Sequence, residues 1–501
     1  MTFWKAAFLC GSVAVLCANC NKTNNTNDND LGGTDLSVLP DLDGGQNDAA
    51  PGDGNPGEDM AQTLSLISAS PPTGPSTGNI DITLTGTGFG SGATVTIDGL
   101  NATVRSGNAT TLVVSLPTRL GGKGLVPVVV RNPSGQTISS STIFAYYFGT
   151  LQFDPAAKTT VGGTPNAIAA TELENNAKLD LVVTDNSLAG QVITLSGNGN
   201  GVFLTPGKFA SGAYAYGLRV LDFDGDGWND VLVANSGSAP SGIGLHLNSK
   251  TGTFPARQVV VSGDLPLSVD AGDLNGDGLK DLVVANGGGA SNNVTVHLGK
   301  AGGLFEAPVT LAAGGIPRSV ILADLNKDGK LDLAVANEQT ANVSVFIGDG
   351  KGAFGAKTDY LVGSGPYALA ATDFTLDGIL DLVVCNYRGA SLSLLPGVGN
   401  GTFNPQKTTS IGTAVSSFPT SIAIGDMNGD GRPDVASAIY ADQQVGITYN
   451  ANGLFGTTTK LLAGAFPRGV AVGDFNGDGK NDLATANSSD GTVSILLNQS
   501  Q

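Results

Sequence analysis

Histidine and cysteine are scarce in this chain, and both shortages limit the chemistry that it can carry out. Its 501 residues include only two histidines and four cysteines. His246 and His297 occupy matching places in an internal repeat where other copies have Phe346 and Leu496, so they are expected to pack in a core rather than act as general bases. No Ser/His/Asp or Cys/His constellation is recognisable. We therefore expect that the chain is not an enzyme.

Basic residues and long apolar runs are also lacking. The chain has 25 Lys and Arg against 43 Asp and Glu, a formal net charge of -18, and no basic patch. Nucleic acid is therefore not an expected partner. The apolar run from Ala6 to Ala18 is too short to cross a bilayer. It follows Lys5 and matches the core of a signal peptide, which predicts export.

The N-terminal segment predicts where the protein resides. Residues 16–20 read LCANC and resemble a bacterial lipoprotein signal, which implies a signal peptide over residues 1–19 and a lipid on Cys20. Because Cys17 and Asn19 depart from that pattern, secretion without a lipid, or a lipid on Cys17, is the alternative. Residues 20–62 are rich in Asn, Asp, Gly and Pro and predict a disordered tether. We expect a protein of the bacterial cell envelope or surface, anchored to the outer or another membrane only through the lipid, or else secreted.

After cleavage, two cysteines would remain, too few for a disulfide framework. One is Cys20. The other, Cys385, replaces the alanine of a repeated VVAN sequence and is expected to be a small core residue.

Acidic loops recur seven times at a nearly constant spacing. They begin at Glu172, Asp222, Asp273, Asp324, Asp373, Asp426 and Asp474, at steps of 50, 51, 51, 49, 53 and 48 residues. Such a period indicates one supersecondary unit in each repeat. Six loops read DxxxDGxxD, which places oxygen-bearing side chains at positions 1, 3, 5 and 9 and a peptide carbonyl at position 7. These oxygens can converge on one hard cation, so the pattern predicts about six Ca²⁺ sites.

The side chain at position 3 differs between the loops. It is an aspartate in the second loop, an asparagine in four loops and a threonine, a weaker ligand, in the fifth, which is therefore expected to be the weakest site. The first loop has Glu172, Glu174 and Asn176, with Ala177 in place of the bend glycine, and is expected to stay empty. The predicted ligands are Asp222, Asp224, Asp226, Trp228, Asp230, Asp273, Asn275, Asp277, Leu279, Asp281, Asp324, Asn326, Asp328, Lys330, Asp332, Asp373, Thr375, Asp377, Ile379, Asp381, Asp426, Asn428, Asp430, Arg432, Asp434, Asp474, Asn476, Asp478, Lys480 and Asp482.

An EF-hand loop opens in the same way. However, position 12 is Val233 or Val284 in the second and third loops, where an EF-hand needs a bidentate glutamate. The residues after each loop, such as DLVVAN, are short and β-branched, which predicts strands rather than a helix. The remaining alternative is an acidic turn that only solvates a hairpin and binds no calcium.

Each period is predicted to contain four short strands. An inner run such as RGVAVGD precedes the loop, a second and a third strand follow it, and a glycine turn with a phenylalanine leads to the fourth. Four strands per period are typical of a propeller blade. The chain ends just after the third strand of the seventh blade, so the segment from Leu151 to about Val161 is predicted to supply the fourth strand and close the ring.

Two family resemblances refine this prediction. The sequences KGAF, NGTF and DFNGDGKNDLATAN make residues 150–501 resemble the FG-GAP and VCBS repeat proteins, which include the integrin α-chain propeller. Residues 63–147, through LTGTGFG and VRNPSG, resemble an IPT/TIG immunoglobulin-like domain. The expected fold is therefore all-β, a seven-bladed β-propeller preceded by an immunoglobulin-like β-sandwich docked closely against it.

The propeller resemblance implies calcium loops on one face and ligand-binding loops on the other. The expected function is a cell-surface recognition or adhesion module for carbohydrate or an extracellular protein. The alternatives are an accessory or divergent polysaccharide-active propeller and a purely structural envelope scaffold. Aromatic and arginine side chains suit ligand contacts, although the alternative for each residue is that it packs against a neighbouring blade. The candidate ligand-binding residues are Tyr214, Tyr216, Tyr367, Tyr387, Arg388, Tyr440 and Phe466.

Overall fold

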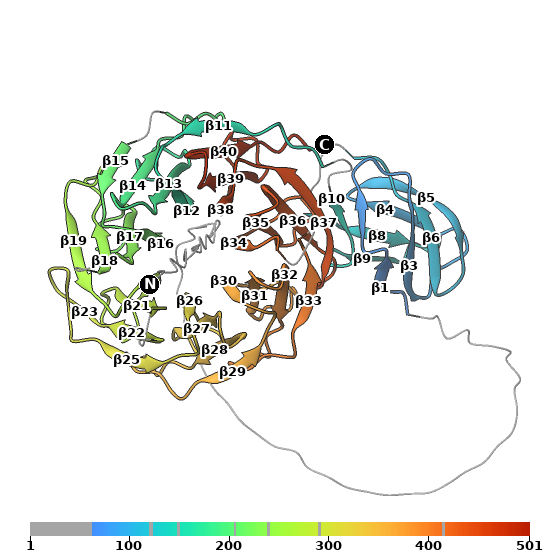
Figure 1. The fold of residues 1–501 in the computed structure, drawn as a ribbon. Coiled ribbons are helices and arrows are strands. Elements are labelled where there is room, and N and C mark those ends of the chain that lie inside the picture. The colour runs from blue at the N-terminus through green and yellow to red at the C-terminus, as the bar shows by residue number, and fades with distance from the viewer. Residues whose placement is uncertain are drawn as a thin grey trace, which may run out of the picture.

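The computed structural model is all-β and has two parts, a sandwich and a ring of blades (Figure 1). It describes residues 63–119, 124–147, 151–204, 207–237, 241–288, 292–412 and 416–500. The predicted signal peptide, Cys20 and the tether lie outside these ranges. No helix occurs within them, and therefore none that is long and apolar enough to span a membrane.

The first part is a sandwich of two sheets. The larger sheet has the strand order β1-β3-β6-β5-β4-β8-β9 and the smaller β2-β10-β7. Alternating burial along Asp81–Thr87 turns Ile82 and Leu84 inward, where they pack with Phe144 and Tyr146. The strands are β1 (Ser65–Ser70), β2 (Thr73–Pro75), β3 (Asp81–Thr87), β4 (Thr94–Ile97), β5 (Leu100–Gly107), β6 (Thr111–Ser115), β7 (Gly124–Leu125), β8 (Val128–Arg131), β9 (Thr137–Ser140) and β10 (Ala145–Tyr147).

The second part consists of seven antiparallel four-stranded sheets arranged as a propeller, as predicted (Figure 1). The inner strands are β12 (Pro165–Thr171), β16 (Ala215–Leu221), β20 (Pro266–Gly272), β26 (Pro317–Ala323), β30 (Pro366–Thr372), β34 (Pro419–Gly425) and β38 (Pro467–Gly473). The second strands are β13 (Asp180–Asp185), β17 (Asp230–Asn235), β21 (Asp281–Asn286), β27 (Asp332–Asn337), β31 (Asp381–Asn386), β35 (Asp434–Ile439) and β39 (Asp482–Asn487).

The third and outer strands complete each blade. The third strands are β14 (Gln191–Leu195), β18 (Gly242–His246), β22 (Asn293–His297), β28 (Asn342–Phe346), β32 (Ser391–Leu395), β36 (Gln444–Asn450) and β40 (Thr492–Leu496). The outer strands are β15 (Gly207–Ala210), β19 (Arg257–Val261), β25 (Val309–Ala312), β29 (Thr358–Leu361), β33 (Lys407–Ser410), β37 (Phe455–Leu462) and, in the seventh blade, β11 (Ala157–Thr160). A small two-stranded sheet, β23 (Gly299–Lys300) with β24 (Leu304–Phe305), lies between the third and outer strands of the third blade in the sequence.

The ring closes through the segment predicted for that role. Strand β11 pairs antiparallel with β40, so Ala157 lies opposite Ile495 and Thr160 opposite Thr492. In the sequence, the outer strand of the seventh blade therefore comes before the first blade. Because the two ends of the propeller share one sheet, the third strand of the seventh blade is not left as an open edge.

The apolar core of the propeller lies between the blades. Among the described residues, seven buried clusters correspond to the seven joints between neighbouring blades. At the closing joint, Ile168 and Leu181 of the first blade pack with Ala484 and Ile495 of the seventh. Every second strand is buried along its whole length because it is covered on both faces. This explains why these strands read as continuous apolar runs.

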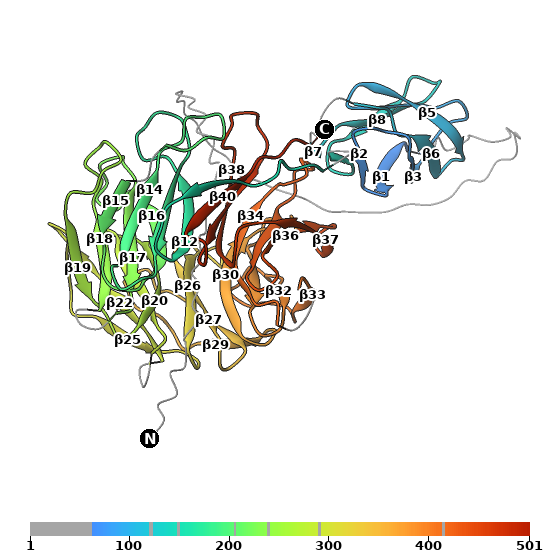
Figure 2. The ribbon, with the colours of Figure 1, turned by 45° about the horizontal axis from the view of Figure 1, so that its top comes forward.

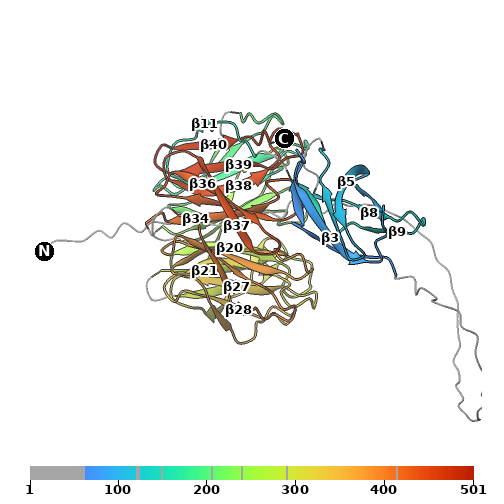
Figure 3. The same cartoon turned by 90° about the vertical axis from the view of Figure 1, so that its right-hand side faces the viewer.

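The sandwich lies against the sixth blade (Figures 2 and 3). The contact brings Gly124 of β7 next to Gly431 in the sixth acidic loop. The sandwich is thus docked closely against the propeller, as predicted, through a contact between the two backbones.

Candidate functional site

The seven acidic loops join the inner to the second strand of each blade and share one backbone shape. Positions 4 and 6 have positive φ in every copy. Position 6 is the bend glycine in six loops, and Ala177 adopts φ 59° there in the first. Position 4 is glycine in four loops, whereas Asn175, Lys327 and Leu376 adopt the same conformation in the other three. The first loop therefore keeps the bend despite lacking the glycine.

The second loop gathers three carboxylates. Asp222, Asp224 and Asp226 each offer an oxygen within 4.8 Å of the others. Calcium binds oxygens at about 2.3–2.6 Å, so two ligands on opposite sides of the ion are about 5 Å apart, and these three fit one ion. The Asp222 carboxylate also accepts the N–H of Gly225 at 2.8 Å and of Gly227 at 2.9 Å, which holds the loop in this shape.

The aspartate at position 9 ties the loop to the blade. In the second repeat, Asp230 is 1% exposed and accepts the N–H of Phe223 at 2.9 Å and of Asn248 at 2.7 Å. The equivalent aspartate accepts two such bonds in all seven repeats, one from inside the loop and one from the end of the third strand. A carboxylate has lone pairs to spare, so position 9 can anchor the loop and also bind a cation.

The position-9 carboxylates are buried close to other acidic side chains of the same loop. Burial, together with the neighbouring loop carboxylates, raises the pKa of Asp230 to about 6 and that of Asp482 to about 7. A divalent cation in each loop would relieve this repulsion. The donor set of these loops therefore fits calcium.

The first and fifth loops differ from the rest. In the first, Glu174 accepts hydrogen bonds from Asn176 at 3.0 Å and Ser196 at 2.6 Å, so its carboxylate is engaged within the protein. In the fifth, the N–H of Thr375 at position 3 donates a hydrogen bond to Asp381 at position 9, at 2.8 Å. In the other loops this hydrogen bond is donated by the residue at position 2, such as Phe223. These differences fall in the two loops predicted to be empty and weakest, respectively.

The acidic loops lie at the joints between blades. In six of them, the carbonyl at position 2 accepts a hydrogen bond from the turn that leads out of the third strand of the next blade. Gly352 of the fourth blade, for example, donates to Leu274 of the third loop at 3.0 Å, and Asn248 of the second blade donates to Leu173 of the first loop at 2.9 Å. A bound cation would therefore brace both its own hairpin and a joint.

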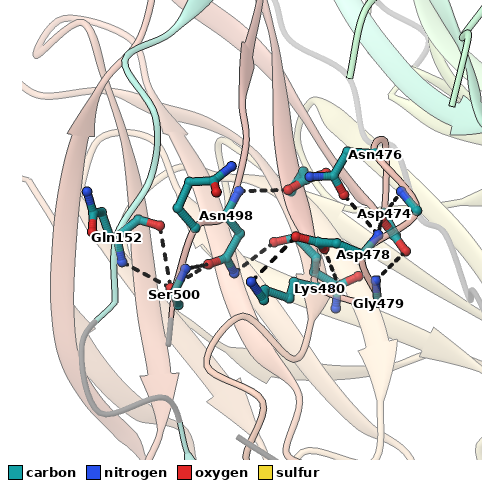
Figure 4. A network of polar contacts seen from close by, with 12 residues as sticks. Gln152, Asp474, Asn476, Asp478, Gly479, Lys480, Asn498 and Ser500 are labelled. Carbon is teal, nitrogen blue, oxygen red and sulfur yellow. Dashed lines mark hydrogen bonds and ion pairs between the residues drawn. The ribbon is translucent and has the colours of Figure 1, made fainter. Parts of the chain in front are cut away.

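The seventh loop adjoins the ring closure (Figure 4). Asp474 accepts the N–H of Gly479 at 2.8 Å, and Asp482 accepts that of Asn498 at 2.7 Å. Ser500, two residues further on, accepts the N–H of Gln152 at 3.0 Å. The loop, the last strand and the closing segment thus form one polar network.

The opposite end of the propeller has a different character. Each inner strand begins there, and we call the residues directly before the seven inner strands the rim residues: Thr164, Tyr214, Leu265, Ile316, Gly365, Phe418 and Phe466. All except Thr164 have positive φ, between 49° and 67°. Five bulky side chains therefore occupy a conformation that glycine usually takes, at a cost of about 1–3 kcal/mol each.

Most of the predicted ligand-binding aromatic residues pack against one another. Tyr387 stacks between Tyr367, at 5.1 Å, and Phe418, at 4.7 Å between ring centroids. Tyr440 packs on Phe466 at 4.9 Å, and Tyr367 is only 1% exposed. Tyr214, by contrast, is 43% exposed.

A buried ion pair, absent from the sequence prediction, lies beside these rings. The Arg318 guanidinium donates to Glu338, and Arg388 donates to the same carboxylate at 2.8 Å. Arg318 also lies 4.9 Å over the ring of Tyr367. The arginines hold the pKa of Glu338 below its usual value, although burial opposes them as the largest single influence. No local sequence pattern marks this group, because Arg318 and Glu338 of the fourth blade lie 20 positions apart and Tyr367 and Arg388 come from the fifth blade.

A cavity of about 790 Å³ opens beside four of the rim residues, Thr164, Tyr214, Leu265 and Ile316, and we call this region the channel mouth. Among the predicted residues, Tyr214 and Tyr216 line it, and Tyr367, Tyr387, Arg388, Tyr440 and Phe466 do not. Its wall also includes Arg318 and Arg468, from the fourth and seventh blades, which the sequence prediction missed.

The histidines and Cys385 lie in the core, where the sequence placed them. His246 and His297 are each 1% exposed and pack edge-on against Phe254 and Phe305. Burial lowers the pKa of each to about 4. Cys385 is fully buried, and burial raises the pKa of its thiol.

Family comparisons agree with this architecture. The FG-GAP-like repeat family matches residues 173–233, 222–284, 273–335, 324–384 and 373–437, more than half of the chain. An FG-GAP repeat matches residues 466–496, and an IPT/TIG domain matches residues 64–146. No curated protein matches the chain.

Several solved structures are similar in fold. An auxiliary nutrient-binding protein from Bacteroides ovatus is 13% identical with a TM-score of 0.40, over 87% of this chain and 98% of that one. An Agrocybe aegerita lectin that recognises non-reducing terminal N-acetylglucosamine is 18% identical with a TM-score of 0.43, over 73% and 94%. Hydrazine synthase from Kuenenia stuttgartiensis is 15% identical with a TM-score of 0.48, over 67% and 96%. These likenesses do not bear on ligand or activity.

Proposed function

The chain belongs to the FG-GAP-like repeat family, and on this premise we propose that it is an exported, calcium-braced propeller that recognises carbohydrate at its channel mouth. The observation that carries the recognition role is the cavity of about 790 Å³. Its size suits a small ligand or a sugar unit, since ligand pockets usually measure about 300–1,000 Å³. Its lining combines apolar side chains with a few polar groups, as ligand pockets do.

The proposed role of calcium is structural. Position 1, 3, 5 and 9 side chains of the six intact loops, with the position-7 carbonyl, would hold the ions. When bound, calcium supplies positive charge to buried and crowded carboxylates such as Asp230 and Asp482. Because the loops also accept hydrogen bonds from the next blade, their ordering stabilises the joints on which the channel mouth depends.

We propose export to the bacterial cell envelope, with a lipid on Cys20 and a tether over residues 20–62. The support is the resemblance of the N-terminal sequence to a lipoprotein signal. A tether of about 40 residues has a root-mean-square reach of roughly 35 Å, which would hold the sandwich and propeller clear of a membrane. A lipid would be detected as a mass increase on the N-terminal peptide, and a peptide beginning at an unmodified residue would refute it.

A non-catalytic role fits the placement of the titratable groups. Both histidines are buried in blade cores, and the thiol of Cys385 is inaccessible. The proposed calcium ligands nearly saturate the ion, which leaves little room for a substrate. Binding without turnover is therefore expected.

The test is a glycan panel probed with the exported chain in calcium, with product analysis of each bound glycan. We expect binding without cleavage, weakened by Tyr214→Ala at the exposed rim and unchanged by Leu361→Ala, which alters an exposed apolar side chain on the outer strand β29. Cleavage of any bound glycan would instead favour a polysaccharide-active enzyme. Failure to bind any glycan, with capture of an extracellular protein through the same rim, would replace carbohydrate by protein as the ligand.

A further inference from the structure

The channel-mouth cavity has a local charge opposite to that of the whole chain. Arg318 and Arg468 line it, and none of its described lining residues carries a carboxylate. The formal net charge of the chain is -18. Two guanidinium groups in one cavity of such an acidic protein indicate a preference for an anionic ligand.

The neighbouring ion pair brings two arginines to one carboxylate. Glu338 binds both Arg318, which lines the cavity, and Arg388, which does not. Arg318 and Glu338 are each less than 10% exposed. The ion pair between them holds the guanidinium plane of Arg318 at the cavity wall. A rigid guanidinium presents paired N–H donors that match the two oxygens of a carboxylate.

The rest of the wall has the features of a sugar site. Tyr214 and Leu265 are 43% and 45% exposed and offer apolar surface for the face of a pyranose ring. The Oδ1 of Asn186 is buried and has no hydrogen-bond partner among the described residues, and Asn292 and Gln339 add further amides. A buried acceptor without a donor is costly in the free protein. A ligand hydroxyl would satisfy it.

Three of the six rim residues with positive φ lie along the same wall. The rim residues Tyr214, Leu265 and Ile316 line the cavity with φ of 55°, 49° and 55°. Bulky residues with positive φ persist where the surrounding structure enforces them, and they occur preferentially at ligand sites. In this protein the strain sets three side chains around the opening.

We propose that the cavity binds a saccharide unit that carries a carboxylate, with Arg468 and Arg318 holding the carboxylate, Tyr214 under the sugar ring and Asn186 accepting a hydroxyl. This inference rests on the proposed carbohydrate recognition and adds the chemical class of the ligand. It differs from recognition of a neutral glycan in requiring the two arginines.

The experiment is calorimetric titration of the full exported chain in calcium with two acidic probes, trigalacturonate and a sialylated trisaccharide, and with neutral galactotriose. We expect at least one acidic probe to bind about tenfold or more tightly than galactotriose, because the charge-assisted hydrogen bonds are lost with the neutral sugar. Arg468→Gln should weaken acidic binding by about tenfold or more, and Arg468→Lys, which keeps the charge, by less. Lys407→Gln makes the same charge change on the exposed outer strand β33 and should leave binding unchanged.

The outcomes distinguish failure of the acidic-ligand inference from failure of the proposed carbohydrate recognition. Equal binding of acidic and neutral probes, insensitive to Arg468→Gln, overturns the acidic-ligand inference and leaves carbohydrate recognition in place. Absence of binding by both acidic probes also overturns it, whatever the wider glycan panel shows. Thermal unfolding of each variant identifies an Arg468→Gln chain that fails to fold, and the Arg468→Lys titration then decides the question.

Discussion

A Cβ atom placed on Gly124 of the sandwich would lie 3.0 Å from the Cα of Gly431 in the sixth acidic loop. The two domains therefore meet backbone to backbone at a candidate calcium site. Asp430 of this loop is 3% exposed, whereas its counterparts in the other five intact loops are exposed. Burial, followed by the charge of Asp426, raises the pKa of Asp430 to about 6. The sandwich thus covers one of the six intact acidic loops.

Replacing Gly124 by alanine should loosen this contact. The added Cβ would press on Gly431, so the sandwich must move away from the sixth blade, and the radius of gyration in small-angle scattering should rise. Gly99→Ala is the matched control, because Gly99 lies in the same sandwich at φ 77°, close to the 75° of Gly124, with no atom within 4 Å of its added Cβ. If the two variants scatter alike, the contact does not hold the domains together in solution.

Removing a position-1 ligand should remove one ion. Asp273→Ala takes away the carboxylate that accepts two backbone N–H groups of the third loop. We expect one calcium fewer per chain and a lower melting temperature in calcium, with a much smaller difference from wild type in chelator. Glu172→Ala in the first loop should leave the number of ions unchanged. Loss of an ion in the Glu172 variant would show that the first loop is a site after all.

The buried histidines should lower stability on mild acidification, relative to a chain that lacks them. His246 and His297 have a pKa of about 4 in the folded chain against an ordinary 6.5, so between these values the unfolded chain binds more protons. The contribution of the histidines to the free energy of unfolding therefore decreases as the pH drops from 6.5 towards 4, by about 3 kcal/mol at most for each histidine. Loop carboxylates with a raised pKa, such as Asp230 and Asp482, act in the opposite direction in both proteins compared below. Denaturant unfolding across this window, compared with His246→Phe combined with His297→Leu, measures the effect. Parallel pH profiles for the two proteins would contradict it.

The buried carboxylate at the channel mouth should matter more than its exposed partner. Glu338→Gln leaves Arg318 buried without its counter-charge and should cost on the order of 3 kcal/mol in the free energy of unfolding. Arg388→Gln removes the exposed arm of the same network, whose side chain is 62% exposed, and should cost less than about 1 kcal/mol. Chemical denaturation of both variants measures the two losses in the free energy of unfolding. Equal losses would mean that the burial of the Arg318 pair has no energetic consequence.

Periodicity was sufficient to predict the blades, because each repeat encodes the same four strands around one loop. The pairing of β11 with β40 was also predictable, since six blades had four strands and the seventh had three. The proline that starts six of the inner strands, such as Pro266, fits a first strand residue because proline has no N–H to donate. These features depend on local pattern and counting, which a sequence displays directly.

Features that depend on the assembled ring were not predictable. Arg318 and Arg468 lie 150 positions apart in the sequence, and only the circular arrangement brings them to one cavity. The left-handed backbone at Lys327 and Leu376 is imposed by the loop, because neither residue favours it. The stack of Tyr367, Tyr387 and Phe418 likewise joins two blades. Calcium binding, export and the lipid on Cys20 remain predictions.

The most direct test counts bound calcium and follows thermal unfolding on the same sample, the chain from Thr63 to Gln501. Equilibrium dialysis should find about six ions per chain, and excess chelator should lower the melting temperature strongly, since a ligand that binds only the folded state at about 100 times its Kd adds about 2.7 kcal/mol per site. Absence of bound calcium, with the same melting temperature in calcium and in chelator, would contradict the calcium-braced propeller.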